Sequence, residues 1–221
     1  SRWRARERAR NAADRALRYL RSEGYYAAVA DPRLDDDGRP LVRVRPGVRF
    51  IFEEVSVSLV AASGPAPDQA AGEALFSLQG EPVRAQDVIG AISEVETALW
   101  ESGYPDAELD TRTITVDHAD QRATGAFNFA AGDFIRLGEP QLAGGLADLR
   151  PAFIARLAPY EVGEPARRSA LNDYARRLQA LDSIALVDVR VAPDAQAEVR
   201  PVDVRLEPAP RHRIELGAGY S

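Results

Sequence analysis

Three long segments of the chain place apolar residues at helical spacing, and each is followed by segments in which apolar and polar residues alternate. The helical pattern covers residues 3–23, 84–102 and 166–181. Two alternating segments around a turn predict an antiparallel hairpin after each helix. The hairpin strands are predicted at residues 25–29 with 41–45, at 107–116 with 121–130, and at 186–192 with 200–207. The pattern therefore predicts a repeated helix–strand–strand unit.

Two of the three units also begin with a strand and a short helix. Residues 48–60 and 134–142 are predicted strands, and short helices are predicted at residues 74–78 and 149–157. The apolar phase of the first strand changes at Glu53-Glu54, which indicates a β-bulge. The complete unit is therefore strand, short helix, long helix, strand, strand. The first copy is expected to lack its opening strand and short helix.

A constant spacing relates the copies. Gly24, Gly103 and Asp182, next to the ends of the long helices, are separated by 79 residues in each step. The same offset superposes three buried-face positions of the helices: Leu20, Leu99 and Leu178; Ala16, Val95 and Tyr174; and Ala13, Ile92 and Leu171. Several apolar positions in phase indicate a true internal repeat.

The chain ends in a separate alternating segment within residues 210–221. Ile214, Leu216, Ala218 and Tyr220 fall on one face of this predicted strand. We interpret it as the first strand of a larger sheet. The predicted organisation is a truncated first module at residues 1–46, complete modules at 47–131 and 132–209, and the start of that sheet at 210–221.

Composition limits the classes of protein to which the chain could belong. It is 45% hydrophobic and contains no cysteine, so it is globular, without disulfides or thiolate metal sites. The net charge of −6 argues against nucleic-acid binding. Residues 1–46 nevertheless contain twelve arginines and only seven acidic residues. The first helix is thus either a patch for an acidic partner or lipid head groups, or simply a solvated basic face.

The residues that could carry chemistry favour structural roles. His118 lies between two aspartates but in a predicted turn, and His212 lies between arginines. Asp35-Asp36-Asp37-Gly38 lacks the ligand spacing of a calcium loop and is predicted to be a hairpin turn. Glu53-Glu54 lies at a bulge, not across a cleft. We therefore predict no catalytic residue, no metal ligand, no bound cofactor and no enzyme activity.

The repeated unit resembles the POTRA domain, the periplasmic module of the outer-membrane assembly superfamily that includes BamA and TamA. The motifs that carry the resemblance are Gly24-Tyr25-Tyr26-Ala27-Ala28, Gly103-Tyr104-Pro105-Asp106-Ala107, Pro46-Gly47, Gly80-Glu81-Pro82, Gly163-Glu164-Pro165 and the terminal Arg211-His212-Arg213 strand. The resemblance implies an α+β fold of tandem β-α-α-β-β modules, each a three-stranded mixed sheet with two helices on one face. Three modules directly before a β-barrel strand resemble TamA, whereas BamA usually has five.

The resemblance also implies a function. The expected protein is a non-catalytic periplasmic arm of an outer-membrane protein that guides unfolded β-barrel or autotransporter substrates and docks a TamB-like periplasm-spanning partner. The absent barrel would anchor it in the outer membrane. An exposed strand edge can bind an extended chain by β-augmentation. The edge positions expected to do so are Ala107, Leu109, Thr111, Val187, Val189 and Val191.

Two alternatives remain open from the sequence. The chain could be the POTRA region of BamA itself. It could also come from a two-partner-secretion or lipid-export pore that recognises one dedicated ligand.

Overall fold

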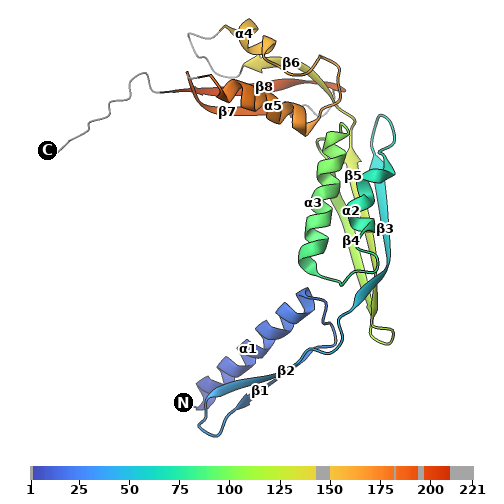
Figure 1. Ribbon diagram of the computed structural model, residues 1–221, viewed down its shortest axis with the longest axis vertical. Helices are drawn as coiled ribbons and strands as arrows, with labels where there is room; N and C mark the ends of the chain where they lie inside the picture. The colour runs from blue at the N-terminus through green and yellow to red at the C-terminus, as the bar shows by residue number, and fades with distance from the viewer. Residues whose placement is uncertain (1, 143–149, 182, 194–196, 210–221) are drawn as a thin grey trace, which may run out of the picture. The chain divides into compact units, whose positions relative to one another are not determined.

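The computed structural model describes residues 2–142, 150–181, 183–193 and 197–209 (Figure 1). The strand predicted within 210–221 lies outside the described residues. The chain divides into two compact units. One contains the chain up to Val60 with Ala66–Ala98 and Ala107–Ala130, and the other contains Ala61–Pro65, Leu99–Asp106 and the chain from Ala131 onward.

The first sheet is a hairpin covered by one helix. Strands β1 (Val29–Leu34) and β2 (Pro40–Arg45) pair antiparallel, and helix α1 (Arg2–Ser22) packs on them (Figure 1). Small side chains make this close packing possible, because Ala9 and Ala13 are the buried residues of the helix. The predicted helix and the second strand of the predicted hairpin are confirmed.

The strand predicted at residues 25–29 is wrong, because β1 begins only at Val29. Helix α1 ends at Ser22, and Gly24 follows with a φ of +90°, the left-handed conformation common after a helix. The Tyr25 N–H then bonds to the Leu20 carbonyl, and the Ala28 N–H bonds to the Tyr25 carbonyl. The chain therefore turns where the apolar pattern predicted extension, and the ring of Tyr26 packs edge-on against Phe50.

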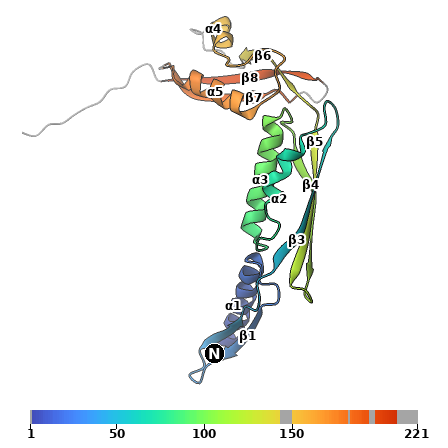
Figure 2. The same ribbon diagram turned by 45° about the vertical axis from the view of Figure 1, so that its right-hand side comes forward.

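The second sheet has three strands in the order β3-β5-β4, with both helices on one face (Figures 1 and 2). Its elements are β3 (Ile51–Ala61), the 3-10 turn η1 (Gln69–Gly72), α2 (Glu73–Phe76), α3 (Ala85–Glu101), β4 (Glu108–Asp117) and β5 (Arg122–Gly132). Phe52 and Val55 are buried while Glu53 and Glu54 between them are exposed, which is the predicted change of phase. Of the apolar face predicted for the long helix, Val88, Val95 and Leu99 are buried, whereas Ile92 is half-buried.

The third sheet repeats this order as β6-β8-β7. Its elements are β6 (Arg136–Leu142), α4 (Pro151–Arg156), α5 (Arg168–Gln179), β7 (Ile184–Val191) and β8 (Val199–Pro208). β8 pairs parallel with β6 and antiparallel with β7, so the sheet is mixed, as predicted. Helix α4 packs on β6 and α5 packs on β7. The α+β prediction is confirmed.

The Gly-Glu-Pro motifs attach the loop before each long helix to the first strand of its sheet. The Gly80 N–H donates to the Phe52 carbonyl and the Phe52 N–H donates to the Glu81 carbonyl. In the third sheet the same two bonds join Gly163 and Glu164 to Leu137. The repeated sequence motif thus produces a repeated hydrogen-bond pattern.

The helix-ending glycines are also used twice in the same way. The Gly24 carbonyl accepts from the Phe50 N–H at 2.9 Å. The Gly103 carbonyl accepts from the Ile135 N–H at 2.9 Å. In both cases the glycine ends one helix and bonds to the residue just before the next sheet begins, so the spacing of 79 residues reflects a repeated joint.

The core of the third sheet contains two tyrosines whose ionisation opposes folding. The Tyr174 hydroxyl donates to the Ile154 carbonyl at 2.7 Å, and the rings of Tyr174 and Tyr160 meet edge to face. Burial raises the pKa of Tyr174 from 10.0 to about 12. Burial, and then the charge of Tyr174, also raise the pKa of Tyr160.

These shifts predict a loss of stability at alkaline pH. Because the pKa of Tyr174 is higher in the folded state than in the unfolded state, the contribution of this side chain to the free energy of unfolding is complete below pH 10. That contribution is lost as the pH rises through about 12. For Tyr174 we expect a loss on the order of 2 kcal/mol, measured by urea unfolding at successive pH values. Tyr174→Phe should flatten this dependence, and the exposed Tyr19→Phe should leave it unchanged. An equal slope in wild type and Tyr174→Phe would contradict the prediction.

Candidate functional site

The free strand edges are the features that the sequence predicts to bind a partner. β5 and β8 are the central strands, so β4 and β7 each form an edge of their sheet. An edge strand presents unpaired N–H and C=O groups that can bond to another extended chain. The two sets of predicted residues therefore lie on or beside edge strands.

The β7 edge is regular over its predicted binding positions. The Ala192 N–H bonds to the Pro201 carbonyl of β8, and pairing continues without a shift from Leu186 to Val191. Because backbone groups alternate in direction along a strand, those of Val187, Val189 and Val191 point away from β8. This edge therefore offers three N–H and three C=O groups in a row.

The side chains at these positions also suit an added strand. Val187, Val189 and Val191 are half-buried and pack against the core of the third sheet. Asp188 and Arg190, which alternate with them, form an ion pair with each other. The predicted positions on β7 thus combine open backbone groups with valines held in place by the core.

The β4 edge is irregular at its predicted positions. Ala107 precedes the first strand residue, Glu108, and the register with β5 shifts between Leu109 and Thr111. A β-bulge leaves a residue unpaired and twists the edge, which discourages further pairing. Thr111 accepts a hydrogen bond from the Asn128 amide at 2.7 Å. Binding at these positions remains a prediction.

The β1 edge lacks the backbone donor at its centre. The Asp35 N–H donates to the carbonyl of Arg39, the residue before β2. Because backbone groups alternate in direction along the strand, those of Pro32 point away from β2. Proline has no N–H, and natural edge strands use it to resist pairing. The sequence shows the proline, but whether its backbone faces β2 or the open edge depends on the hydrogen bonds of the hairpin.

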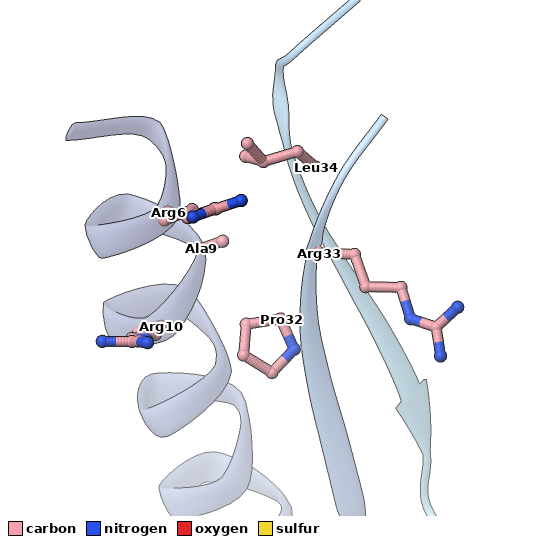
Figure 3. Close-up of a pocket in the computed structure, with 6 residues that line it drawn as sticks. All are labelled: Arg6, Ala9, Arg10, Pro32, Arg33 and Leu34. Carbon is pink, nitrogen blue, oxygen red and sulfur yellow. The ribbon is translucent and has the colours of Figure 1, made fainter. Parts of the chain in front are cut away.

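A groove lies between α1 and β1 (Figure 3). It has a volume of about 500 Å³ and is lined by Arg6, Ala9, Arg10, Pro32, Arg33 and Leu34. Pro32 and Leu34 point toward the helix, whereas Arg33 points away from it (Figure 3) and pairs with Asp31. The groove thus has apolar walls with the arginines of α1 beside it, a combination that the sequence alone did not reveal.

A buried arginine was also missed from the sequence. Arg200 is 4% exposed, and its Nη1 donates to Asp106 Oδ2 at 2.8 Å. Nearby in the chain, Val202 and Val204 face the core with it. The sequence contained the information needed to find it. Val202 and Val204 are inward-facing positions of the predicted strand, and alternation along a strand places residue 200 on the same face.

A carboxylate caps α5 from outside the helix. The N–H and hydroxyl of Ser169 donate to the two oxygens of Glu101 at 2.7 and 2.6 Å. The guanidinium of Arg168 lies 5.1 Å from the centre of the Trp100 ring. The helix has no side-chain cap of its own at Arg167, so Glu101 satisfies donors that the first turn leaves free.

The residues considered for chemistry lie apart. His118 is in the exposed turn after β4, and its ring packs edge-on against Phe50 at 5.4 Å. Glu53 pairs with Arg122 at 3.4 Å. Within the described ranges, no three His, Asp or Glu side chains are placed to hold a metal ion. None of the described helices is both long enough and apolar enough to span a membrane.

Comparisons with known proteins identify the fold. No protein-family model matches the chain, and no curated protein matches it. The crystal structure of POTRA3-5 of Haemophilus influenzae BamA aligns with a TM-score of 0.58 at 16% identity, over 88% of this chain and 79% of that one. The crystal structure of Haemophilus ducreyi BamA lacking POTRA domains 1-3 also gives 0.58, at 14% identity, over 72% of this chain and 30% of that one. The chain therefore has the fold of tandem POTRA modules.

Proposed function

We propose that this chain is the periplasmic arm of an outer-membrane assembly protein and that it binds unfolded substrate strands along the β7 edge. In this proposal residues 1–46, 47–131 and 132–209 are POTRA modules, the first of them truncated, and residues 210–221 begin an outer-membrane barrel. The arm is non-catalytic, guides β-barrel or autotransporter substrates, and docks a TamB-like partner. The preferred assignment within the superfamily is TamA.

The β7 edge carries the proposal. Its outward backbone groups at Val187, Val189 and Val191 supply hydrogen bonds that do not depend on the sequence of the bound chain. A receptor for many different β-barrel substrates needs this property. The half-buried valines pack against the core and hold the strand in place, so binding costs little conformational entropy in β7.

A second candidate is the corresponding region of a BamA protein. Both solved structures described above come from BamA, and one contains three consecutive POTRA modules. The two candidates share the strand-edge chemistry. They differ in the partner, because a TamB-like protein should bind this arm only in the first case.

Replacing Val189 by proline tests the β7 edge. Proline removes one outward N–H and leaves the bonds to β8 in place, so an edge-bound strand should lose an essential contact. The probe is a fluorescent ten-residue peptide that alternates apolar and polar residues. We expect at least tenfold weaker binding in Val189→Pro by fluorescence anisotropy, and less than a threefold change in Val189→Ala, which keeps the N–H.

Amide hydrogen exchange gives a second readout that does not depend on a variant. The N–H groups of Val187, Val189 and Val191 should become protected when the peptide binds, whereas those of Asp188 and Arg190 already bond to β8. Peptide binding without new protection at the three valines would contradict the edge-receptor proposal. Equal affinities for Val189→Pro and Val189→Ala would contradict it as well.

A further inference from the structure

Helix α1 is strongly basic, and its charge is not neutralised locally. It contains eight arginines and two acidic residues. None of these arginines forms an ion pair with another described residue. Uncompensated charge on one element raises the local concentration of anionic ligands.

The groove beside α1 adds shape to this charge. Arg6 and Arg10 lie on successive turns of α1 and line the groove, together with Ala9, Pro32 and Leu34. In Figure 3 the Arg6 side chain extends toward β1, whereas that of Arg10 extends away from it. Ala9 is only 1% exposed, so Pro32 and Leu34 supply the apolar surface that a bound chain can reach. A volume of about 500 Å³ is in the range of pockets that bind small ligands or a few side chains.

The spacing of the arginines matches an extended peptide. Arg2, Arg6 and Arg10 follow one another at intervals of four residues, which places successive side chains about 5–6 Å apart along one side of the helix. Alternate residues of an extended chain are separated by about 6.6 Å on one face. Carboxylates at every second position of such a chain can therefore meet successive arginines.

Strand addition is not the mode that this site favours. Pro32 removes the central outward N–H of β1, which leaves only the groups of Ala30 and Leu34 to either side. Side-chain contacts with the arginines and the apolar wall must then supply the affinity. This distinguishes the groove from the β7 edge, where the backbone supplies it.

A lipid surface fits the site less well. The two exposed aromatic side chains of α1, Trp3 and Tyr19, are 69% and 66% exposed. They are sixteen residues apart, so at about 100° per residue they point to nearly opposite sides of the helix. A membrane-surface helix instead gathers its aromatic residues on one apolar face.

The other modules indicate that the groove stays open in a complete module. In the third sheet the short helix α4 packs on the first strand, and the long helix α5 packs on the edge strand β7. In the first copy the groove lies between the long helix α1 and the edge strand β1. An opening strand would pair with β2, as β6 pairs with β8, so this strand and its short helix would lie on the side of β2 that faces away from β1.

We propose that the groove between α1 and β1 binds an extended, acidic segment of a partner protein, with alternate carboxylates on Arg6 and Arg10 and apolar side chains against Pro32 and Leu34. This site is separate from the strand-edge receptor proposed above. It assigns to the first sheet a partner selected by charge, while the third sheet binds chains without regard to sequence.

Two peptides of identical composition test the proposal on the 221-residue chain carrying Val189→Pro, which blocks the β7 edge. One alternates Glu and Val over ten residues, and the other places all Glu before all Val. Fluorescence anisotropy should give at least tenfold tighter binding of the alternating peptide, and added salt should weaken it because the contacts are ionic. Equal affinity of the two peptides would overturn the proposal, since diffuse attraction does not depend on order.

Charge-reversal variants locate the site. Arg6→Glu/Arg10→Glu should weaken binding of the alternating peptide at least tenfold. Arg8→Glu/Arg15→Glu makes the same change in net charge at exposed positions away from the groove, and it should alter affinity less than threefold. Equal losses in both variants would overturn the proposal. So would binding to phosphatidylglycerol vesicles combined with no binding of the alternating peptide.

Because the Glu/Val peptides are measured with the β7 edge blocked by Val189→Pro, their binding reports on the groove. Arg6→Glu/Arg10→Glu, made in the wild-type background, should leave the protection of Val187, Val189 and Val191 by the β7 peptide unchanged. Failure of one proposal can therefore be told from failure of the other.

Discussion

Gly103→Ala is expected to destabilise the unit that contains the third sheet by about 3–4 kcal/mol. Gly103 has a φ of +102°, where any other residue is strained. An added Cβ would also lie 2.5 Å from Phe134 Cε2 and 3.2 Å from Pro165 Cβ. The ring of Phe134 has little room to move, because it is only 7% exposed and packs edge-on against Tyr104.

Gly163→Ala is the matched control for this substitution. Gly163 also has a positive φ, +96°, but a Cβ there would meet nothing within 4 Å. Gly163→Ala should therefore lower the free energy of unfolding only through backbone strain, by about 1–2 kcal/mol. The difference between the two variants measures the cost of crowding Phe134.

Tryptophan fluorescence can follow this unit separately. The chain has two tryptophans, Trp3 and Trp100. In a Trp3→Phe background the emission reports on Trp100, which packs against the core of the third sheet. Urea unfolding of both variants in this background gives the two free energies. Equal losses for Gly103→Ala and Gly163→Ala would show that the close approach of Phe134 is unimportant.

Asp106→Ala is expected to cost about 3 kcal/mol, although the aspartate itself is half exposed. Its carboxylate is the partner of Arg200, whose side chain is only 5% exposed. Removing the carboxylate leaves a buried cation without its counter-charge, and the Arg200 Nε already lacks a partner among the described residues. The cost thus comes from the arginine that remains.

A second substitution should restore the stability that the first one removes. Arg200→Met replaces the buried cation by an apolar side chain of similar length, which is often nearly neutral in such sites. The double variant Asp106→Ala/Arg200→Met should therefore be more stable than Asp106→Ala alone. The same Trp100 fluorescence measurement applies. Additive losses in the double variant would contradict this account of the pair.

Local patterns were sufficient for the elements and their repetition. The long helices, the phase change at Glu53-Glu54 and the hairpin turn at Asp35–Gly38 follow from short-range spacing, and the structure confirms them. The strand predicted at residues 25–29 was wrong because apolar residues after a helix-ending glycine can pack in a turn. The periodicity of a five-residue segment does not distinguish the two cases.

The candidate site could be predicted only in part. The alternation of valines identified β7, but whether a residue's backbone faces outward depends on which partner strand it bonds to. The same limit applied to Pro32, whose presence was plain and whose direction was not. The groove beside α1 could not be foreseen, because Arg6 and Leu34 come together only when the hairpin folds onto the helix.

The sequence by itself determined the repeated order of helices and strands, the glycine that ends the first two long helices, and the excess of arginine in the first helix. These depend on residues a few positions apart, where spacing and backbone preference act directly. The tertiary structure alone decided which strand edges are open, that Arg200 pairs with Asp106, and that the arginines of α1 border an apolar groove. Those features join residues far apart in the chain, and only packing of the folded core sets their distance and direction.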